Sequence, residues 1–102
     1  MKLHLKSHSV NLSGLSLEMI KAVLHAARVW QLHGMSQLTI TSANDGTHKP
    51  GSKHYDGDAV DLRTWSLPDL LGMADQLRQD LGPDYDVVIE QDHLHIEYDP
   101  KN

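Results

Sequence analysis

The spacing of hydrophobic and polar residues along the chain predicts two amphipathic helices. Apolar residues recur at helical intervals over residues 17–33, between Ser16, a favourable N-cap, and Gly34, which ends the helix. A second helix is predicted to begin after Ser66 as N-cap and to end at Gly82. The expected buried stripes comprise Ile20, Val23, Leu24, Ala27 and Trp30 in the first helix, and Leu67, Leu70, Leu71, Ala74, Leu77 and Leu81 in the second.

Short segments of alternating or β-branched residues predict the strands. Residues 1–13 alternate weakly, which fits either an edge strand or an irregular arm over the core. Together the elements predict one domain over residues 1–102, of the α+β class, with two helices packed on one face of a mainly antiparallel sheet of about four strands. The four expected strands cover residues 38–41, 58–63, 86–90 and 93–98, and the last two form a hairpin.

Composition and charge exclude several classes of protein. With 102 residues the chain is large enough for one modest core. Its net charge of −5, with neutral histidines, leaves no basic surface for nucleic acid, and its lack of cysteine excludes disulfides. No apolar run approaches the length of a membrane span, and residues 1–6 are too polar for a signal peptide. We therefore expect a monomer that is made as a soluble cytoplasmic protein, with no nucleic-acid partner.

Histidines and carboxylates are concentrated in two short segments, residues 52–62 and 90–97. The first of them overlaps a polar loop of about sixteen residues, 42–57, which is long enough to suggest a function. Nitrogen and oxygen donors without thiolate suit a catalytic zinc site, which needs three protein ligands and one open position. His54 and Asp61, with one histidine of the second segment, would supply the three ligands. We expect the site on the open face of the sheet, under this loop.

The second segment provides two histidines on one side of a strand. His93 and His95 are two residues apart, so their side chains point to the same face. One imidazole can bind a metal ion while the other handles a proton or holds a reacting oxygen. Glu90, at the end of the preceding strand, is a nearby carboxylate that could accept the proton of a zinc-bound water.

These residues also form a recognisable pattern. Ser-x-His-x-x-Gly-x-Ala-x-Asp over residues 52–61, followed by His-x-His over residues 93–95, resembles the zinc D-Ala-D-Ala carboxypeptidase family, peptidase family M15. The same signature occurs in phage endolysins of that family and in the related signalling domain of hedgehog proteins. The run from Asp45 through Asp61 is most similar to the hedgehog-like version. The resemblance covers about residues 38–98.

The resemblance implies a role for each residue of the pattern. His54, Asp61 and His95 would bind Zn2+, His93 would be a catalytic neighbour, and Glu90 would be the general base. In some members the ligand follows the acid as Glu-x-x-His, and under that alignment His93 and His95 exchange roles. The choice between the two histidines therefore stays open at this point.

Three further residues are candidates around the zinc site. Ser52 matches a substrate-side serine of the family, although a serine there can also cap the backbone of its own loop. Many members carry an oxyanion-stabilising arginine before the motif, and this chain has none there. His48 is the preferred substitute, and Lys49 or Arg63 are alternatives. Arg63 is also a candidate for binding the substrate. Asp58 occupies a position that is often basic in relatives.

The expected function is that of a zinc metallopeptidase that cleaves a peptide bond in bacterial peptidoglycan. The resemblance allows a D,D-carboxypeptidase or an endolysin-type endopeptidase, and the small size fits a phage or prophage lysis enzyme that is released or delivered to the cell wall. One alternative is a zinc-binding interaction domain without catalysis, as in hedgehog proteins. Others are a metal-dependent phosphoester hydrolase, or a structural domain that binds no metal.

Overall fold

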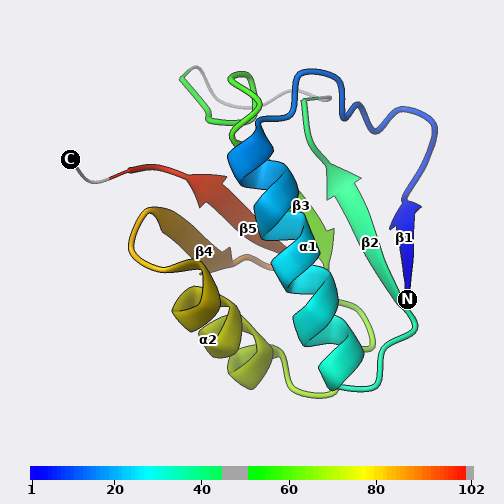
Figure 1. The fold of residues 1–102 in the computed structure, drawn as a ribbon. Helices are drawn as coiled ribbons and strands as arrows, with labels where there is room; N and C mark the ends of the chain where they lie inside the picture. Colours follow the sequence, from blue (N-terminus) through cyan, green and yellow to red (C-terminus); the bar gives the residue numbers. More distant parts are fainter. Residues whose placement is uncertain (45–50, 101–102) are drawn as a thin grey trace.

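Two helices cover one face of a five-stranded sheet in the part of the chain that the structure describes, residues 1–44 and 51–100 (Figure 1). The structure is a computed structural model. The helices are α1 (Leu17–Leu32) and α2 (Leu70–Leu81), and the strands are β1 (Lys2–Leu5), β2 (Gln37–Ser42), β3 (Ala59–Arg63), β4 (Tyr85–Ile89) and β5 (His93–Tyr98).

The strand order is β1-β2-β3-β5-β4, and every neighbouring pair is antiparallel except β1 with β2. The predicted α+β class is therefore confirmed. The sheet has one strand more than the four expected, because the weakly alternating N-terminal segment pairs along β2 as an edge strand.

The alternation of side chains along β3 and β5 separates the core from the candidate site. Val60 and Leu62 of β3 and Leu94 and Ile96 of β5 are fully buried in the core beneath the helices. Neighbouring residues of a strand point to opposite faces. The residues that alternate with these four therefore point to the face that neither helix covers. Those residues are Asp61 of β3 with His93, His95 and Glu97 of β5.

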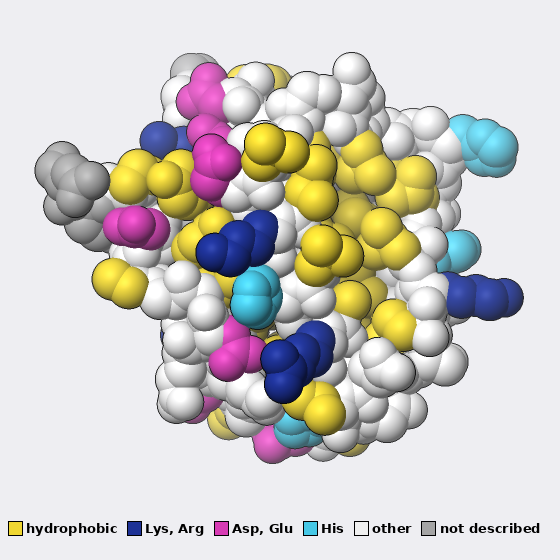
Figure 2. Space-filling model, in the orientation of Figure 1, with side chains coloured by type: hydrophobic (Ala, Val, Ile, Leu, Met, Phe, Trp, Pro, Cys, Tyr) yellow, Lys and Arg dark blue, Asp and Glu magenta, His cyan; other side chains and the backbone are white. Residues whose placement is uncertain are grey.

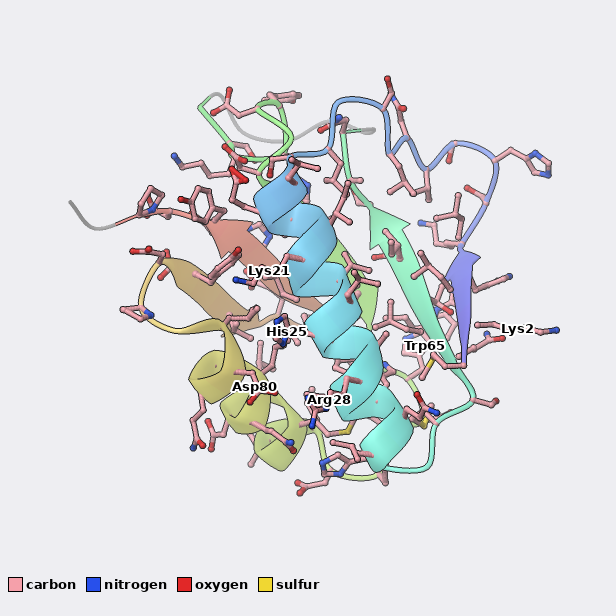
Figure 3. All side chains as sticks on the ribbon, in the orientation of Figure 1. Lys2, Lys21, His25, Arg28, Trp65 and Asp80 are labelled. Atoms are coloured by element: carbon pink, nitrogen blue, oxygen red, sulfur yellow. The ribbon has the colours of Figure 1, made fainter. Side chains whose placement is uncertain are left out.

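The predicted buried stripe of α1 is partly wrong. Ile20 and Leu24 are 43% and 66% exposed, and Leu17 is 78% exposed. The true inner face combines large residues, Met19 and Trp30, with small ones such as Ala22, and it is turned away from Ile20 and Leu24. Hydrophobic side chains accordingly gather on the helix-covered side of the molecule (Figure 2), and the outer side of α1 also carries Lys21 and Arg28 (Figure 3). The buried residues of α1 are Met19, Ala22, Val23, Ala26, Val29 and Trp30.

The predicted start of α2 is also wrong. Asp69 is the N-cap, with its side chain accepting a hydrogen bond from the backbone N–H of Gly72, and Ser66 lies before the helix with a φ of 64°. The residue before a proline disfavours the helical conformation, so Pro68 prevents the helix from extending back through Leu67. Leu71, a predicted core residue of this helix, is 70% exposed.

Gly57 connects the turn that contains His54 with the start of α1 through a backbone hydrogen bond. Its carbonyl accepts a hydrogen bond from the backbone N–H of Ser16 at 2.9 Å, and its φ is 75°. A Cβ atom at this position would overlap the carbonyl oxygen of Gly14. Glycine is therefore required here by both the backbone conformation and the close approach of two chain segments.

Gly57→Ala is expected to lower the free energy of unfolding by about 3 kcal/mol, since it adds backbone strain and a steric clash. Denaturant unfolding followed by circular dichroism measures the loss. Gly34→Ala is the matched control, because Gly34 also has a positive φ, of 86°, but a Cβ there meets no described atom within 4 Å. Equal losses in the two variants would show that the contact with Gly14 adds nothing to backbone strain.

Candidate metal centre

His54 is held in the turn after the long loop with one ring nitrogen already engaged. The side chain is buried, and Nδ1 lies 2.7 Å from the carbonyl oxygen of Ala43. A carbonyl can only accept, so Nδ1 carries the proton, and in the neutral ring Nε2 keeps its lone pair. The backbone N–H of His54 donates to Ser52 Oγ at 3.2 Å, which confirms that Ser52 caps its own loop.

Asp61 and His95 face each other across the β3–β5 ladder. They are directly paired in the register, and His95 Nδ1 lies 2.9 Å from Asp61 Oδ1. His54 Nε2 reaches the same carboxylate oxygen from the loop, at 3.4 Å. One atom of each residue lies within 4.8 Å of the other two, so His54, Asp61 and His95, hereafter the donor group, could hold a metal ion.

The spacing and chemistry of the donor group fit zinc. Zinc–nitrogen and zinc–oxygen bonds of about 2.0–2.1 Å in a tetrahedral site separate the ligand atoms by roughly 3.3 Å. The two measured distances, 2.9 and 3.4 Å, lie on either side of that value. Two imidazoles and one carboxylate also match the composition of catalytic zinc sites.

The charge on Asp61 suits a cation. Burial by itself would raise the pKa of this carboxyl, but the hydrogen bonds from His54 and His95 outweigh burial, and the pKa lies well below its usual value. Asp61 is therefore ionised at physiological pH and offers a permanent negative charge to the donor group.

Glu97 orients His95 from the side away from Asp61. Its Oε1 lies 2.9 Å from His95 Nε2, and Glu97 and His95 share a face because they are two residues apart on β5. A carboxylate on Nε2 keeps a proton there, so that in the neutral ring it is the Nδ1 lone pair that faces the donor group. Glu97 was not among the residues predicted from the sequence, although the alternation that places His93 beside His95 points to Glu97 as well.

An open cleft of about 560 Å³ lies beside the donor group. His93 and Glu90 line it, and Val88, which pairs with His95 across the β4–β5 ladder, lies on the same face. His93 Nε2 is 3.7 Å from Asp61 Oδ1, and its Nδ1 is 2.7 Å from Asp92 Oδ1. The Glu90 side chain is exposed, and its backbone N–H donates to the carbonyl of His93 at 2.9 Å.

The structure thus brings together most of the residues that the sequence indicated. The donor group contains His95 and not His93, while His93, Glu90 and Ser52 line the adjoining cleft. Arg63 lies on the same face of β3 as Asp61 but lines a separate hollow. His48 lies outside the described residues.

Comparisons with known proteins give no relative: no family model matches the chain, and neither a curated protein nor a solved structure does. The class that the fold and site define is an α+β domain with a group of residues that could bind a metal ion. Within residues 1–44 and 51–100, no helix is both long enough and apolar enough to span a membrane.

If the donor group binds zinc, Glu97→Ala is expected to weaken that binding by about 10- to 100-fold, the usual effect of losing a carboxylate that orients a histidine ligand. Glu97→Gln keeps an acceptor for the Nε2 proton and should retain more of the affinity. Competition with a chromophoric chelator measures both. Asp86→Asn is the control, because Asp86 is paired with Glu97 across the ladder, outside the donor group, and forms with Glu97 and Asp99 a second group of carboxylates that could hold a metal ion. If Asp86→Asn weakened binding as much as Glu97→Ala, a general charge effect would replace the orienting role.

Zinc binding is expected to weaken as the pH falls. The hydrogen bond to Asp61 raises the pKa of His95, burial opposes the rise, and the bond to Glu97 adds to it, so the ring keeps its second proton above its ordinary pKa of 6.5. Zinc must displace that proton, so apparent affinity should fall about tenfold per pH unit below the pKa of His95. Calorimetry in buffers of different ionisation enthalpy should detect release of the proton. A constant affinity between about pH 5 and 8 would contradict this expectation.

Proposed function

We propose that the protein is a zinc-dependent hydrolase of peptide bonds in bacterial cell-wall peptides. The observation that carries the proposal is the donor group: three donor atoms converge from a loop and two strands, with both histidine rings oriented by hydrogen bonds, beside an open cleft. Three protein ligands and one accessible side are the arrangement of catalytic rather than structural zinc sites.

The residues around the donor group have distinct proposed roles. Zinc held there would supply Lewis acidity, polarising a peptide carbonyl and lowering the pKa of water. Glu90 would accept the proton of the attacking water and return it to the departing amine. His93, whose Nδ1–H is held by Asp92, would direct Nε2 toward the carbonyl oxygen and, when protonated, stabilise its developing charge. Such a donor typically contributes about 3 kcal/mol to the transition state.

The substrate class comes from the resemblance of residues 52–61 and 93–95 to the zinc D-Ala-D-Ala carboxypeptidases and endolysins. Their substrates are cell-wall peptides that contain D-amino acids. A small peptidase of this type would act after release or delivery to the cell wall, and it fits a phage or prophage origin.

Digestion of purified peptidoglycan tests the proposal. The zinc-loaded protein should release muropeptide products whose masses identify the cleaved bond, and removal of zinc by a chelator should stop the release until zinc is restored. Elemental analysis should give one zinc per chain. Products equal to those of a blank digestion, with zinc fully bound, would reject peptide hydrolysis.

A zinc-binding domain without catalysis is the second candidate. The exposed side chain of Glu90, which makes no hydrogen bond or ion pair with any described residue, favours it, because a general base is usually held in place by its surroundings. This candidate predicts zinc binding without turnover on peptidoglycan. It also predicts that replacing Glu90 changes nothing.

A further inference from the structure

A second hollow, of about 320 Å³, adjoins the donor group on the side away from the Glu90 cleft. The two spaces share Asp61 and His93 in their walls. Lys6, Arg63 and Trp65 line this second space, hereafter the Arg63 hollow. A ligand that lies across Asp61 and His93 would therefore reach both spaces.

Arg63 lies in the hollow and forms no ion pair with any residue that the structure describes. It follows Asp61 by two residues on β3, shares its face, and pairs with His93 across the ladder. Its guanidinium carbon lies 4.3 Å from the ring centroid of Trp65, which is itself 63% exposed. Its Nε is buried and has no hydrogen-bond partner among the described residues. A planar cation stacked on an aromatic ring keeps its N–H groups in one fixed plane, which suits a carboxylate.

Two cations and two carboxylates line the hollow, and they differ in whether they already have partners. Lys6 adds a second cation to that of Arg63. Asp92 also lines the hollow, but its Oδ1 accepts from His93 Nδ1, and this hydrogen bond lowers the pKa of Asp92. Asp61 already faces the two histidines of the donor group. Both carboxylates of the hollow thus have histidine partners, whereas neither Arg63 nor Lys6 forms an ion pair with a described residue.

We infer that the Arg63 hollow binds a carboxylate of the substrate. The Cα atoms of Asp61 and Arg63 are about 6–7 Å apart along β3, and one to two residues of an extended peptide span that distance at about 3.5 Å each. A peptide whose reacting carbonyl lies at the donor group thus places a carboxylate near Arg63. This inference rests on the proposed function for its substrate class, and either a C-terminal carboxylate or an acidic side chain provides the same chemistry.

Binding of matched peptides to the zinc-loaded Glu90→Gln protein tests the inference without turnover. N-acetyl-L-Lys-D-Ala-D-Ala is compared with its C-terminal amide, and a stem peptide with D-isoglutamate is compared with its D-isoglutamine form. Tryptophan fluorescence follows binding, because Trp65 lies in the hollow and Trp30 is buried in the core. The acid of one pair should bind about 10- to 100-fold more tightly than its amide, the effect of a hydrogen bond to a charged group. The pair that responds identifies the source of the carboxylate.

Substitution of Arg63 should remove that preference. Arg63→Gln is expected to bring the acid-to-amide ratio of dissociation constants close to one, and Arg63→Lys to restore part of it. Arg28→Gln is the control, because Arg28 is an exposed arginine of α1 on the helix-covered side of the molecule (Figure 3). It changes the net charge equally and should leave the ratio intact. Far-ultraviolet circular dichroism checks that each variant is folded.

Failure of the inference and failure of the proposed function give different results. Equal binding of acid and amide in both pairs, or a preference that survives in Arg63→Gln, would overturn the carboxylate site even if peptidoglycan is cleaved. A preference that disappears with Arg63 would support the site even if no bond in peptidoglycan is cleaved.

Discussion

Glu90→Gln is expected to lower turnover on peptidoglycan by about 10²- to 10⁴-fold, the usual range for loss of a general base. Glutamine has nearly the same size and cannot accept a proton from water. Glu90 lies in the cleft but outside the donor group, so zinc affinity should not change. The measurement combines muropeptide release with zinc titration of the same protein samples.

A matched variant separates the proton-transfer role from a change in net charge. Glu18→Gln removes the same charge from an exposed position in the first turn of α1, and it should turn over like the wild type. Equal rates for Glu90→Gln and the wild type, both above a blank digestion, would assign the general base to another residue. Equal rates at the level of the blank would instead favour the zinc-binding domain without catalysis.

Asp61→Asn is expected to weaken zinc binding by about 10²- to 10³-fold. A protein zinc site is worth about 10–16 kcal/mol in total, so one of three or four ligands accounts for roughly 3–4 kcal/mol. Asparagine fills the same space but lacks the negative charge of Asp61, whose carboxyl group the two histidines keep ionised. Turnover at limiting zinc should fall to the level of a blank digestion.

Asp92→Asn is the control for Asp61→Asn. Asp92 contacts His93 and lies outside the donor group, so zinc affinity should stay near that of the wild type. If Asp61→Asn bound zinc as tightly as the wild type while Asp92→Asn did not, the metal would lie on the His93 side of Asp61. That result would revive the alternative in which His93 is the ligand.

The convergence of the site could be predicted because it depends on simple periodicity. Asp61 lies between Val60 and Leu62, and His95 lies between Leu94 and Ile96, so burial of the apolar neighbours places both on the open face. The register that sets them opposite each other follows from long-range strand pairing, which one sequence does not reveal. The structure therefore decides that His95, rather than His93, lies closest to Asp61.

Other features depended on tertiary contacts that local patterns do not contain. The inner face of α1 was misplaced because apolar residues occupy more than one side of the helix, and only the contact with the sheet selects Met19 and Ala22 over Ile20 and Leu24. The stacking of Arg63 on Trp65 could not be predicted either, because it depends on how the chain turns after β3. Gly57 of the motif must be a glycine because a side chain there would clash with the backbone of Gly14, more than forty positions earlier in the chain.

The three residues of the donor group come from two kinds of structure, two paired strands and one turn, and this difference matters for how an ion would be held. Asp61 and His95 belong to neighbouring strands, so the ladder between them sets their distance even when the turn moves. His54 arrives on a separate segment that is tied to the rest of the chain at Gly57. Displacement of this turn alone would therefore remove one of the three donors while the strands keep the other two in place.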